Sequence, residues 1–264
     1  MDKHPVITLL TDFKIKDGYA GIMKGVIFSI NPQCQIIDLA HEVSPQMILE
    51  AAFILGYSYR YFPRGSIHMV VVDPGVGGER RPIVVETKEN LFVGPDNGVF
   101  TYIYQEADSV RVFELARREY FLSEVGNTFH GRDIFSPVAA RLSLGIAPEK
   151  FGDEIKDFIK KDIPEIRANE REINGEIIYA DGFGNLVTNI SVKMITDFTR
   201  GKIFDLIVGK KRINGILKCY YDAGEGELLA IFGSSGYLEI SVNKGSARLE
   251  LNADRGDSVR IVIN

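Results

Sequence analysis

The sequence of 264 residues contains no tryptophan and only two cysteines. Cys34 and Cys219 lie far apart in the chain, and neither a CxxC pair nor a cysteine–histidine spacing typical of a metal site occurs. A disulfide framework and a structural zinc site are therefore disfavoured. Two isolated cysteines are typical of a protein from the reducing cytoplasm, and we expect that location.

An excess of positive charge and a long hydrophobic run are also missing. The 36 acidic residues outnumber the 31 basic residues, and the formal net charge is −5. This balance creates no field that would attract a phosphate backbone, which argues against nucleic acid as a partner. The first apolar run, 5–10, ends at Thr11 and Asp12. It is too short for a signal or membrane segment and predicts a first strand.

The rest of the composition is that of a globular protein, with 45% hydrophobic and 25% charged residues. The length fits one large domain or two small ones. Strand and helix patterns alternate up to about residue 145, which predicts an α/β domain around a central, mostly parallel sheet. The predicted strands are 6–10, 35–39, 67–73, 82–87 and a strand that leads into a helix within 91–104, and the other predicted helices are 21–30, 47–61 and 134–144.

A charged stretch at 152–172 carries Pro164 and loses the regular apolar period, which indicates a linker. We therefore predict an α/β catalytic domain over 1–165, with the linker at its end, and an all-β domain over 166–264. In the second domain, Gly- and Asn-rich turns separate short strand patterns, as in a barrel or sandwich. These patterns are 172–178, 185–190, 203–208, 228–232, 237–242 and 259–263.

Polar residues that could carry chemistry follow the predicted strands of the first domain. Asp12 and Asp17 lie in the loop after the first strand, where a carboxylate can accept from the two hydroxyls of a ribose. The alternative is an Asx turn that caps the next helix. Asp73 begins the segment DPGVGGERR, whose glycines permit a tight turn that folds Arg80 back toward Asp73. The alternative there is a surface hairpin with an ordinary ion pair.

The glycine pattern of this segment does not predict a dinucleotide site, because a β-branched run follows where a phosphate-binding loop requires a helix. His130, in the segment TFHGRD, lies at or just before a predicted helix start and has the most site-like neighbours of the four histidines. A lone histidine can equally be a structural group with satisfied hydrogen bonds.

Two glycine-rich turns of the second domain complete the set of candidates. In the segment Asp181-Gly-Phe183-Gly-Asn185, the glycines favour a turn that presents Phe183 to a flat ring, and Asn185 can bind polar ends of a ligand. A hairpin with a buried phenylalanine is the alternative. The segment from Phe232 to Glu239 is a similar small-residue turn between two strands.

Six segments, taken together and in their order along the chain, resemble the S-adenosyl-L-methionine hydroxide adenosyltransferases. This family consists of S-adenosyl-L-methionine hydrolases and is related to fluorinating and chlorinating enzymes. The segments are LLTDFKIKDGYAGIMKGVI (9–27), VVVDPGVGGERR (70–81), FVGPDNGVFT (92–101), TFHGRDIFSPVAA (128–140), DGFGNLVTNI (181–190) and GSSGYLEISVN (233–243). The resemblance spans both predicted domains.

The resemblance implies roles for individual residues. Asp73, Arg80 and His130 match the three catalytic groups that surround the attacking water in this family. Asp12 matches the carboxylate that binds the ribose hydroxyls, and Asp17 is its near neighbour. The implied contacts from the second domain are Asn185 to the methionine end with Asp181 nearby, Phe183 and Tyr220 beside the adenine or sugar, and Ser234 and Glu239 to the amino-acid or adenine portions.

The function implied by the resemblance is hydrolysis of S-adenosyl-L-methionine to adenosine and L-methionine, without a cofactor or a metal. It also implies a homotrimer with each site between two subunits. Arg80 would favour hydroxide, His130 would accept or relay the proton, and Asp73 would orient both. The alternatives are a halogenase that uses chloride, a non-catalytic adenosine- or S-adenosylmethionine-binding module, and a Mg²⁺ or Zn²⁺ site formed by Asp12, Asp17, Asp73 and His130.

Overall fold

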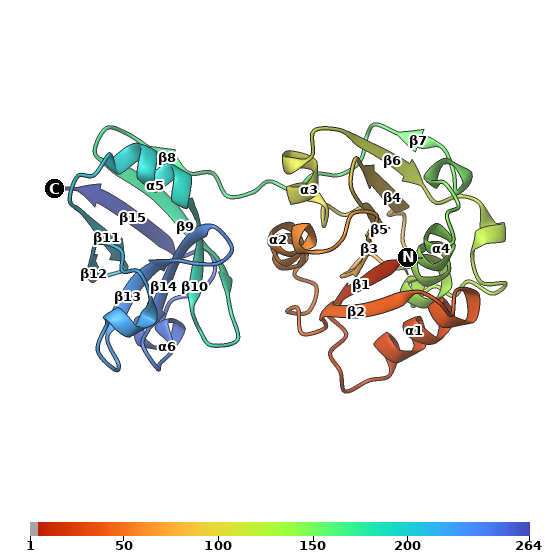
Figure 1. The fold of residues 1–264 in the computed structure, drawn as a ribbon, viewed down its shortest axis with the longest axis horizontal. Coiled ribbons are helices and arrows are strands. Elements are labelled where there is room, and N and C mark those ends of the chain that lie inside the picture. The colour runs from red at the N-terminus through yellow and green to blue at the C-terminus, as the bar shows by residue number, and fades with distance from the viewer. Residues whose placement is uncertain (1–4) are drawn as a thin grey trace. The chain divides into compact units, whose positions relative to one another are not determined.

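The computed structural model describes residues 5–264. The chain forms two compact units that meet in sequence between Lys161 and Asp162, and the predicted boundary between residues 165 and 166 lies just beyond this point. Figure 1 shows a helix-covered sheet in the first unit and a curved sheet in the second.

The first unit is built on a seven-stranded mixed sheet with the order β2-β1-β3-β5-β4-β6-β7. Its first four strands in that order are parallel, and the remaining pairings are antiparallel. All residues of β1 are buried, as predicted for a β-branched run with both faces covered. The strands are β1 Val6–Thr11, β2 Gln35–Ala40, β3 Ile67–Val71, β4 Pro82–Thr87, β5 Leu91–Pro95, β6 Val110–Glu114 and β7 Glu154–Ile155.

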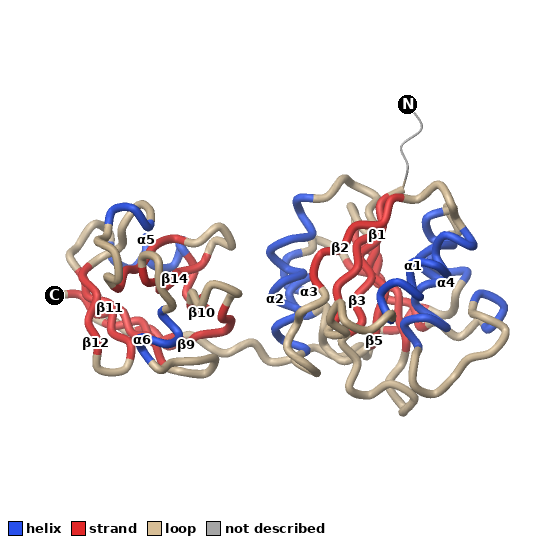
Figure 2. Tube along the Cα trace, turned by 90° about the horizontal axis from the view of Figure 1, so that it is seen from below, coloured by secondary structure: helices blue, strands red, loops and turns tan. Residues whose placement is uncertain are grey.

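Helices cover both faces of this sheet, with α1 and α4 on one side and α2 and α3 on the other (Figure 2). They are α1 Tyr19–Ile30, α2 Ile48–Ser58, α3 Thr101–Glu106 and α4 Ser136–Ser143. Two predicted helices are each divided in the structure. The pattern 47–61 becomes α2 followed by a 3₁₀ turn at Tyr59–Tyr61, and α4 is preceded by a π-helical turn at Gly131–Phe135.

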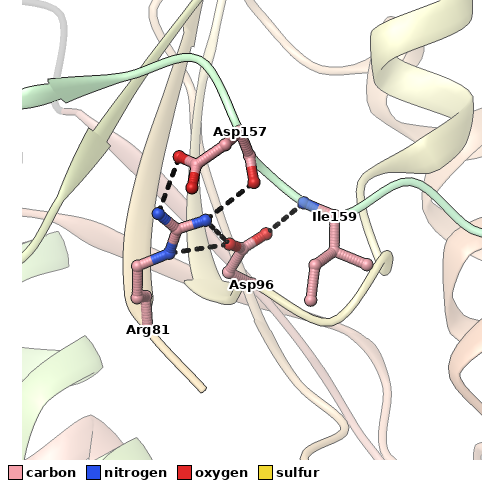
Figure 3. Close-up of polar contacts among 4 residues, drawn as sticks. All are labelled: Arg81, Asp96, Asp157 and Ile159. Atoms are coloured by element: carbon pink, nitrogen blue, oxygen red, sulfur yellow. Dashed lines mark hydrogen bonds and ion pairs between the residues drawn. The ribbon is translucent and has the colours of Figure 1, made fainter. Parts of the chain in front are cut away.

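The first part of the predicted linker is fastened to the first unit by one arginine. Arg81 donates to the buried carboxylate of Asp96 from Nε and Nη2, at 3.1 and 2.8 Å, and to the Oδ1 of Asp157 from Nη1 at 2.8 Å (Figure 3). The other oxygen of Asp96 accepts from the backbone N–H of Ile159 at 2.8 Å. Residues 157–159 therefore belong to the first unit, although they lie within the charged stretch 152–172 that indicated a linker.

The second unit is an antiparallel sheet with the order β12-β11-β15-β9-β10-β14-β13, and β8 pairs with β9. The end strands β12 and β13 approach one another, so the sheet is a nearly closed barrel. Its interior holds aliphatic side chains such as Ile177, Leu206, Leu238 and Ile261. The strands are β8 Arg167–Ala168, β9 Glu172–Ala180, β10 Leu186–Ser191, β11 Phe204–Val208, β12 Lys211–Asn214, β13 Leu228–Phe232, β14 Tyr237–Val242 and β15 Ser258–Ile263.

The strand patterns of the second unit did not predict its short helices. Helix α5, Val192–Thr199, begins where the Ser191 hydroxyl accepts from the backbone N–H of Met194. Helix α6, Ala247–Leu251, begins in the same way at Ser246, and a 3₁₀ turn spans Tyr220–Asp222. The β-rich character of the unit is nevertheless as predicted.

Candidate active site

A buried ion pair lies just beyond the carboxyl end of β3. Arg80 Nε donates to the two carboxylate oxygens of Asp73 at 3.0 and 2.9 Å, and Arg80 Nη2 also donates to Asp73 Oδ2. The Arg80 and Asp73 side chains are 8% and 4% exposed. The turn therefore folds Arg80 back onto Asp73, as predicted, and the alternative of an ordinary surface ion pair is wrong.

The glycines of this turn are needed because the chain passes close to another loop. Gly77 has φ +75°, and a Cβ there would lie 2.1 Å from the backbone oxygen of Asn127. A Cβ on Gly75 would lie 3.2 Å from Cγ of Arg80 itself. The turn and the loop that leads to His130 are thus in direct backbone contact, which only glycine at position 77 permits.

His130 joins the ion pair at the start of the π-helical turn. Arg80 Nη2 lies 2.7 Å from His130 Nδ1. Because a guanidinium carries only donors, Nδ1 accepts this hydrogen bond, and the proton of the neutral imidazole is on Nε2. Burial, followed by the nearby Arg80 guanidinium, lowers the pKa of His130, although Asp73 and Asp133 oppose the shift. His130 is therefore neutral at pH 7.

The loop before His130 is held by a carboxylate that the sequence did not single out. Asp133 is fully buried, and its Oδ2 accepts from the backbone N–H of Gly126 at 2.9 Å. Arg132 donates to the same carboxylate. Gly131 packs closely against helix α1, since a Cβ there would lie 2.8 Å from Sδ of Met23. These contacts fix the position of the His130 backbone.

Asp73 and His130 line a cavity of about 430 Å³ in the first unit, whereas Arg80, which contacts both of them, is not among its lining residues. On another wall, Asp12 accepts from the backbone N–H of Gln46 at 2.8 Å. Within the described residues 5–264, Asp12 has no ion-pair partner, whereas the charge of Asp73 is balanced by Arg80. The cavity is lined by Asp12, Phe13, Tyr19, Pro45, Gln46, Val71, Asp73, Pro74, Val76, Thr128, Phe129, His130 and Gly131.

Not every predicted residue of the first unit reaches this cavity. Asp17 is exposed and is not among the lining residues. Conversely, the aromatic residues Phe13, Tyr19 and Phe129 line the cavity but were not predicted as site residues. Each is adjacent or nearly adjacent in sequence to a candidate polar residue, and that proximity is the signal that could have identified them.

In the second unit, Asp181 organises the turn between β9 and β10. Its Oδ1 accepts from the backbone N–H groups of Phe183 and Asn185, and its Oδ2 accepts from Nδ2 of Asn185, all at 2.9 Å. Phe183 is 82% exposed, so the alternative of a hairpin with a buried phenylalanine is wrong. Asn185 is buried and donates one Nδ2 hydrogen to Asp181, which leaves its Oδ1 available as an acceptor.

A buried carboxylate lies on the same face of this sheet. Glu239 pairs across the strands with Val187, so alternation places Glu239 on the face that Asn185 shares. Glu239 Oε1 accepts from the Tyr220 hydroxyl at 2.5 Å and from Ser241 Oγ at 2.8 Å. Burial, together with the hydrogen bond to Glu239, raises the pKa of Tyr220 to about 12. Tyr220 is therefore a donor at any assay pH.

Ser234 is exposed in the turn between β13 and β14. The same turn approaches Glu239 at Gly233, where a Cβ would lie 2.8 Å from Glu239 Oε2. The second unit thus brings Asp181, Asn185, Tyr220 and Glu239 to one face of its sheet, with Phe183 and Ser234 on exposed turns.

The arrangement of Asp17, Asp73 and His130 disfavours the alternative of a metal site. Asp73 and His130 are both engaged by Arg80, and Asp17 does not line the cavity. Over residues 5–264, no cluster of three or more histidine, cysteine, aspartate or glutamate side chains is arranged to hold a metal ion. The same residues include no helix of the length and apolarity needed to cross a membrane.

Comparison with known proteins identifies relatives of both units. Residues 7–152 match the family model of the S-adenosylmethionine hydroxide adenosyltransferase N-terminal domain, and residues 175–260 match that of its C-terminal domain. The chain is 35% identical to the (R)-S-adenosyl-L-methionine hydrolase of Methanocaldococcus jannaschii, over 97% of this chain and 95% of the relative. It is 27% identical to the fluorinase of Nocardia brasiliensis, over 99% and 98%.

A solved structure shows the same fold. A crystal structure of an uncharacterized conserved protein from Thermotoga maritima superposes with a TM-score of 0.91 at 38% sequence identity, covering 97% of this chain and 99% of that one. The similarity therefore spans both units and their order.

Proposed function

Because the chain belongs to the S-adenosyl-L-methionine hydroxide adenosyltransferase family, we propose that it hydrolyses S-adenosyl-L-methionine to adenosine and L-methionine. The observation that carries the proposal is the buried cluster of Asp73, Arg80 and His130, of which Asp73 and His130 line a cavity that is also lined by Asp12. The relatives that are named hydrolases act on the R epimer of the sulfonium, and we extend that preference to this chain.

The reaction is a displacement at C5′ of the adenosyl group. A bond forms between the oxygen of water and C5′, while the bond between C5′ and sulfur breaks and its electron pair stays on sulfur. The sulfonium becomes the neutral thioether of methionine, and one proton is released. The leaving group is already activated by its positive charge, so the protein has to supply an oriented nucleophile rather than a strong acid.

We assign activation of the nucleophile to Arg80, which contacts the two members of the cluster that line the cavity. Its Nη1 is buried and has no hydrogen-bond partner among the described residues, while Nε and Nη2 are used by Asp73 and His130. A guanidinium that offers a free donor lowers the pKa of a nearby water and stabilises hydroxide. Asp73 holds the guanidinium in position through the bidentate contact.

The role of His130 differs from the one expected from its residue type. With Nδ1 accepting from Arg80 and the proton on Nε2, the neutral imidazole has no free lone pair for the proton of water. In this geometry His130 is a group that fixes Arg80 and shapes the cavity. The nucleophile accordingly loses its proton to solvent instead of to His130.

The remaining contacts belong to the same proposal. Asp12 binds the two ribose hydroxyls, and Asp17 is the second carboxylate of the same loop. Asn185 Oδ1 accepts from the ammonium group of the methionine end, held in place by Asp181. Tyr220, Glu239, Phe183 and Ser234 contact the adenine, sugar or amino-acid portions.

We also propose that the chain is a cytoplasmic homotrimer. The assembly is supported by the family resemblance, which implies that the second unit of a neighbouring chain completes each site. The location is supported by two free cysteines, one of them buried. No cofactor is needed, because the sulfonium substrate itself carries the activation.

Incubation with S-adenosyl-L-methionine in ¹⁸O-labelled water, with and without chloride, tests the function by mass spectrometry of the products. We expect adenosine that carries ¹⁸O at the 5′ position, whatever the chloride concentration. A chlorinated nucleoside would identify a halogenase, and tight binding without products would identify a binding module; either outcome would overturn hydrolysis.

Arg80→Ala tests the catalytic assignment. We expect this variant to lose turnover and to retain adenosine binding, because Asp12 is untouched. Arg64→Ala, at a side chain that is 81% exposed, is the matched control with full turnover. Full activity of Arg80→Ala would contradict the role of the cluster.

A further inference from the structure

Three aromatic rings meet at one side of the cavity. Phe13 follows β1, Tyr19 begins α1, and Phe129 directly precedes His130. Their ring centroids are 5.6 Å apart for Phe13 and Tyr19, 5.8 Å for Phe13 and Phe129, and 5.2 Å for Tyr19 and Phe129. All three residues line the cavity. We call this group the aromatic corner.

The ring orientations suit a compact ligand group better than a flat one. The planes meet at 58°, 77° and 79°, so the rings form a corner and not a parallel-sided slot. A purine stacks between parallel faces, whereas a small cation is attracted to the faces of several rings at once. The geometry therefore favours a compact cationic group.

One member of the aromatic corner is exposed in a way that core packing does not explain. Phe13 and Phe129 pack against the hydrophobic core of the first unit, but Tyr19 lies outside that core cluster and is 45% exposed. Within residues 5–264, the Tyr19 hydroxyl makes no hydrogen bond, and its ring contacts are those with Phe13 and Phe129. Two rings are thus anchored in the protein, and the third extends the aromatic surface over the cavity.

The charges around the aromatic corner complement a cation. Asp12 contributes one unbalanced negative charge to the cavity, because Asp73 is paired with Arg80 and His130 is neutral. Arg132 lies over Phe129 with its Cζ 5.3 Å from the ring centroid, and its own charge is balanced by the buried Asp133. The charged groups named here therefore leave a net negative charge beside the three rings.

From this arrangement we infer that the aromatic corner binds the methylated sulfonium centre of the substrate and selects it over a neutral thioether. The inference rests on the proposed function, in which the sulfonium lies next to the reacting C5′ and so within the same cavity. The methyl group and sulfur are compact, apolar in outline and positively charged, which is the combination that aromatic faces bind.

The chemistry predicts how the aromatic corner acts on the kinetics. The sulfonium loses its charge as the bond between C5′ and sulfur breaks, so the attraction is stronger for bound substrate than for the transition state. Removing one ring should therefore raise KM and leave kcat unchanged or slightly increased. The same loss of attraction helps the neutral methionine product to leave.

The test compares full-length wild-type protein with Tyr19→Leu. The affinity for S-adenosyl-L-methionine is measured as KM in the turnover assay, or by calorimetry if no product forms, and that for the neutral thioether S-adenosyl-L-homocysteine as its inhibition constant in the same assay. We expect Tyr19→Leu to weaken binding of the sulfonium by about 5- to 30-fold, which spans cation–aromatic contacts from exposed to desolvated sites. Binding of the thioether should change by less than about 3-fold.

Two further variants make the comparison specific. Tyr19→Phe keeps the ring and should keep the preference for the sulfonium, which excludes the hydroxyl as the cause. Tyr61→Leu removes an aromatic ring that is 75% exposed and lies outside the cavity, and it should leave both affinities unchanged.

The outcomes separate this inference from the proposed function. Equal losses for the two ligands in Tyr19→Leu, or a fall in kcat at constant KM, would overturn the sulfonium role even if the wild type hydrolyses its substrate. If Tyr19→Leu does not fold, the affinities of the wild type for the two ligands test the inference. Equal affinities for the sulfonium and the thioether would also overturn it. A wild type that prefers the sulfonium but yields no adenosine would refute the hydrolysis and leave the sulfonium role intact.

Discussion

Replacing Gly77 by alanine should separate the two halves of the catalytic cluster. Gly77 belongs to the turn that returns Arg80 to Asp73, and it faces the backbone oxygen of Asn127 in the loop that carries His130. A methyl group at this position would lie 2.1 Å from that oxygen, against 3.4 Å for an ordinary contact, so the two segments must move apart by about 1.3 Å. The left-handed φ of +75° adds about 1–2 kcal/mol of backbone strain for alanine.

A displacement of this size exceeds what the hydrogen bond between Arg80 and His130 can tolerate, since it is 2.7 Å long in the intact site. Misplacement of catalytic groups by about 1 Å costs about 100-fold in rate, which corresponds to about 2.7 kcal/mol of activation free energy. We expect kcat/KM to fall by at least this factor. Adenosine binding should persist, because Asp12 is held by Gln46 and not by this turn.

The assay combines steady-state formation of adenosine with calorimetric binding of adenosine and thermal unfolding. Gly25→Ala is the matched control, because a Cβ there meets nothing within 4 Å and its φ is not left-handed. If Gly77→Ala folds and keeps kcat/KM within about 3-fold of wild type, well short of the expected loss, the contact between the turn and the His130 loop is not what positions the cluster, and the reasoning is refuted.

Two further predictions concern protonation and the linker. Burial and Arg80 lower the pKa of His130 below its ordinary 6.5, so the neutral form persists at that pH. Protonation of Nδ1 would break its hydrogen bond with Arg80, so the His130 imidazole should titrate below pH 6.5 when followed by NMR, and a midpoint above 6.5 would contradict the neutral form. Arg81→Ala should lower the free energy of unfolding by about 3 kcal/mol, because it leaves the buried Asp96 without its cation. Asp157→Ala should cost far less in chemical denaturation, because Asp157 is 80% exposed, and equal losses would argue against this account.

The strands and the turn chemistry could be predicted from the sequence because their signals are local. The boundaries of β13 and β14 match the predicted runs, since a continuous apolar run in β13, apolar alternation in β14 and nearby glycines mark the two strands. Helix α5 was missed because its eight residues follow β10 without a break, and only the cap formed by Ser191 separates the two elements. The π-helical turn at Gly131–Phe135 likewise has no periodic signal that distinguishes it from the helix that follows.

The parts of the site that depend on local sequence could be predicted, and those that depend on distant contacts could not. Asp73 and Arg80 are seven positions apart on one tight turn, so their pairing follows from local glycine chemistry. The meeting of the three rings in the aromatic corner could not be predicted, because Phe129 reaches Phe13 and Tyr19 only through packing of segments more than 100 positions apart in the chain. Which nitrogen of His130 carries the proton also depends on a distant partner, the guanidinium of Arg80.

The burial of the Arg80 and Asp73 pair is itself an argument about the chemistry. A buried ion pair seldom repays its desolvation in stability, so a pair this enclosed is better explained by what it does in the site. By cancelling one another, the two charges leave Asp12 to set the charge of the cavity, which matches a substrate of single positive charge. After the displacement the sulfur is neutral, and both Asp12 and the aromatic corner lose their attraction for the methionine portion. The charge that recruits the substrate is thus removed by the reaction, so methionine should dissociate readily without any group in the cavity having to change its protonation state.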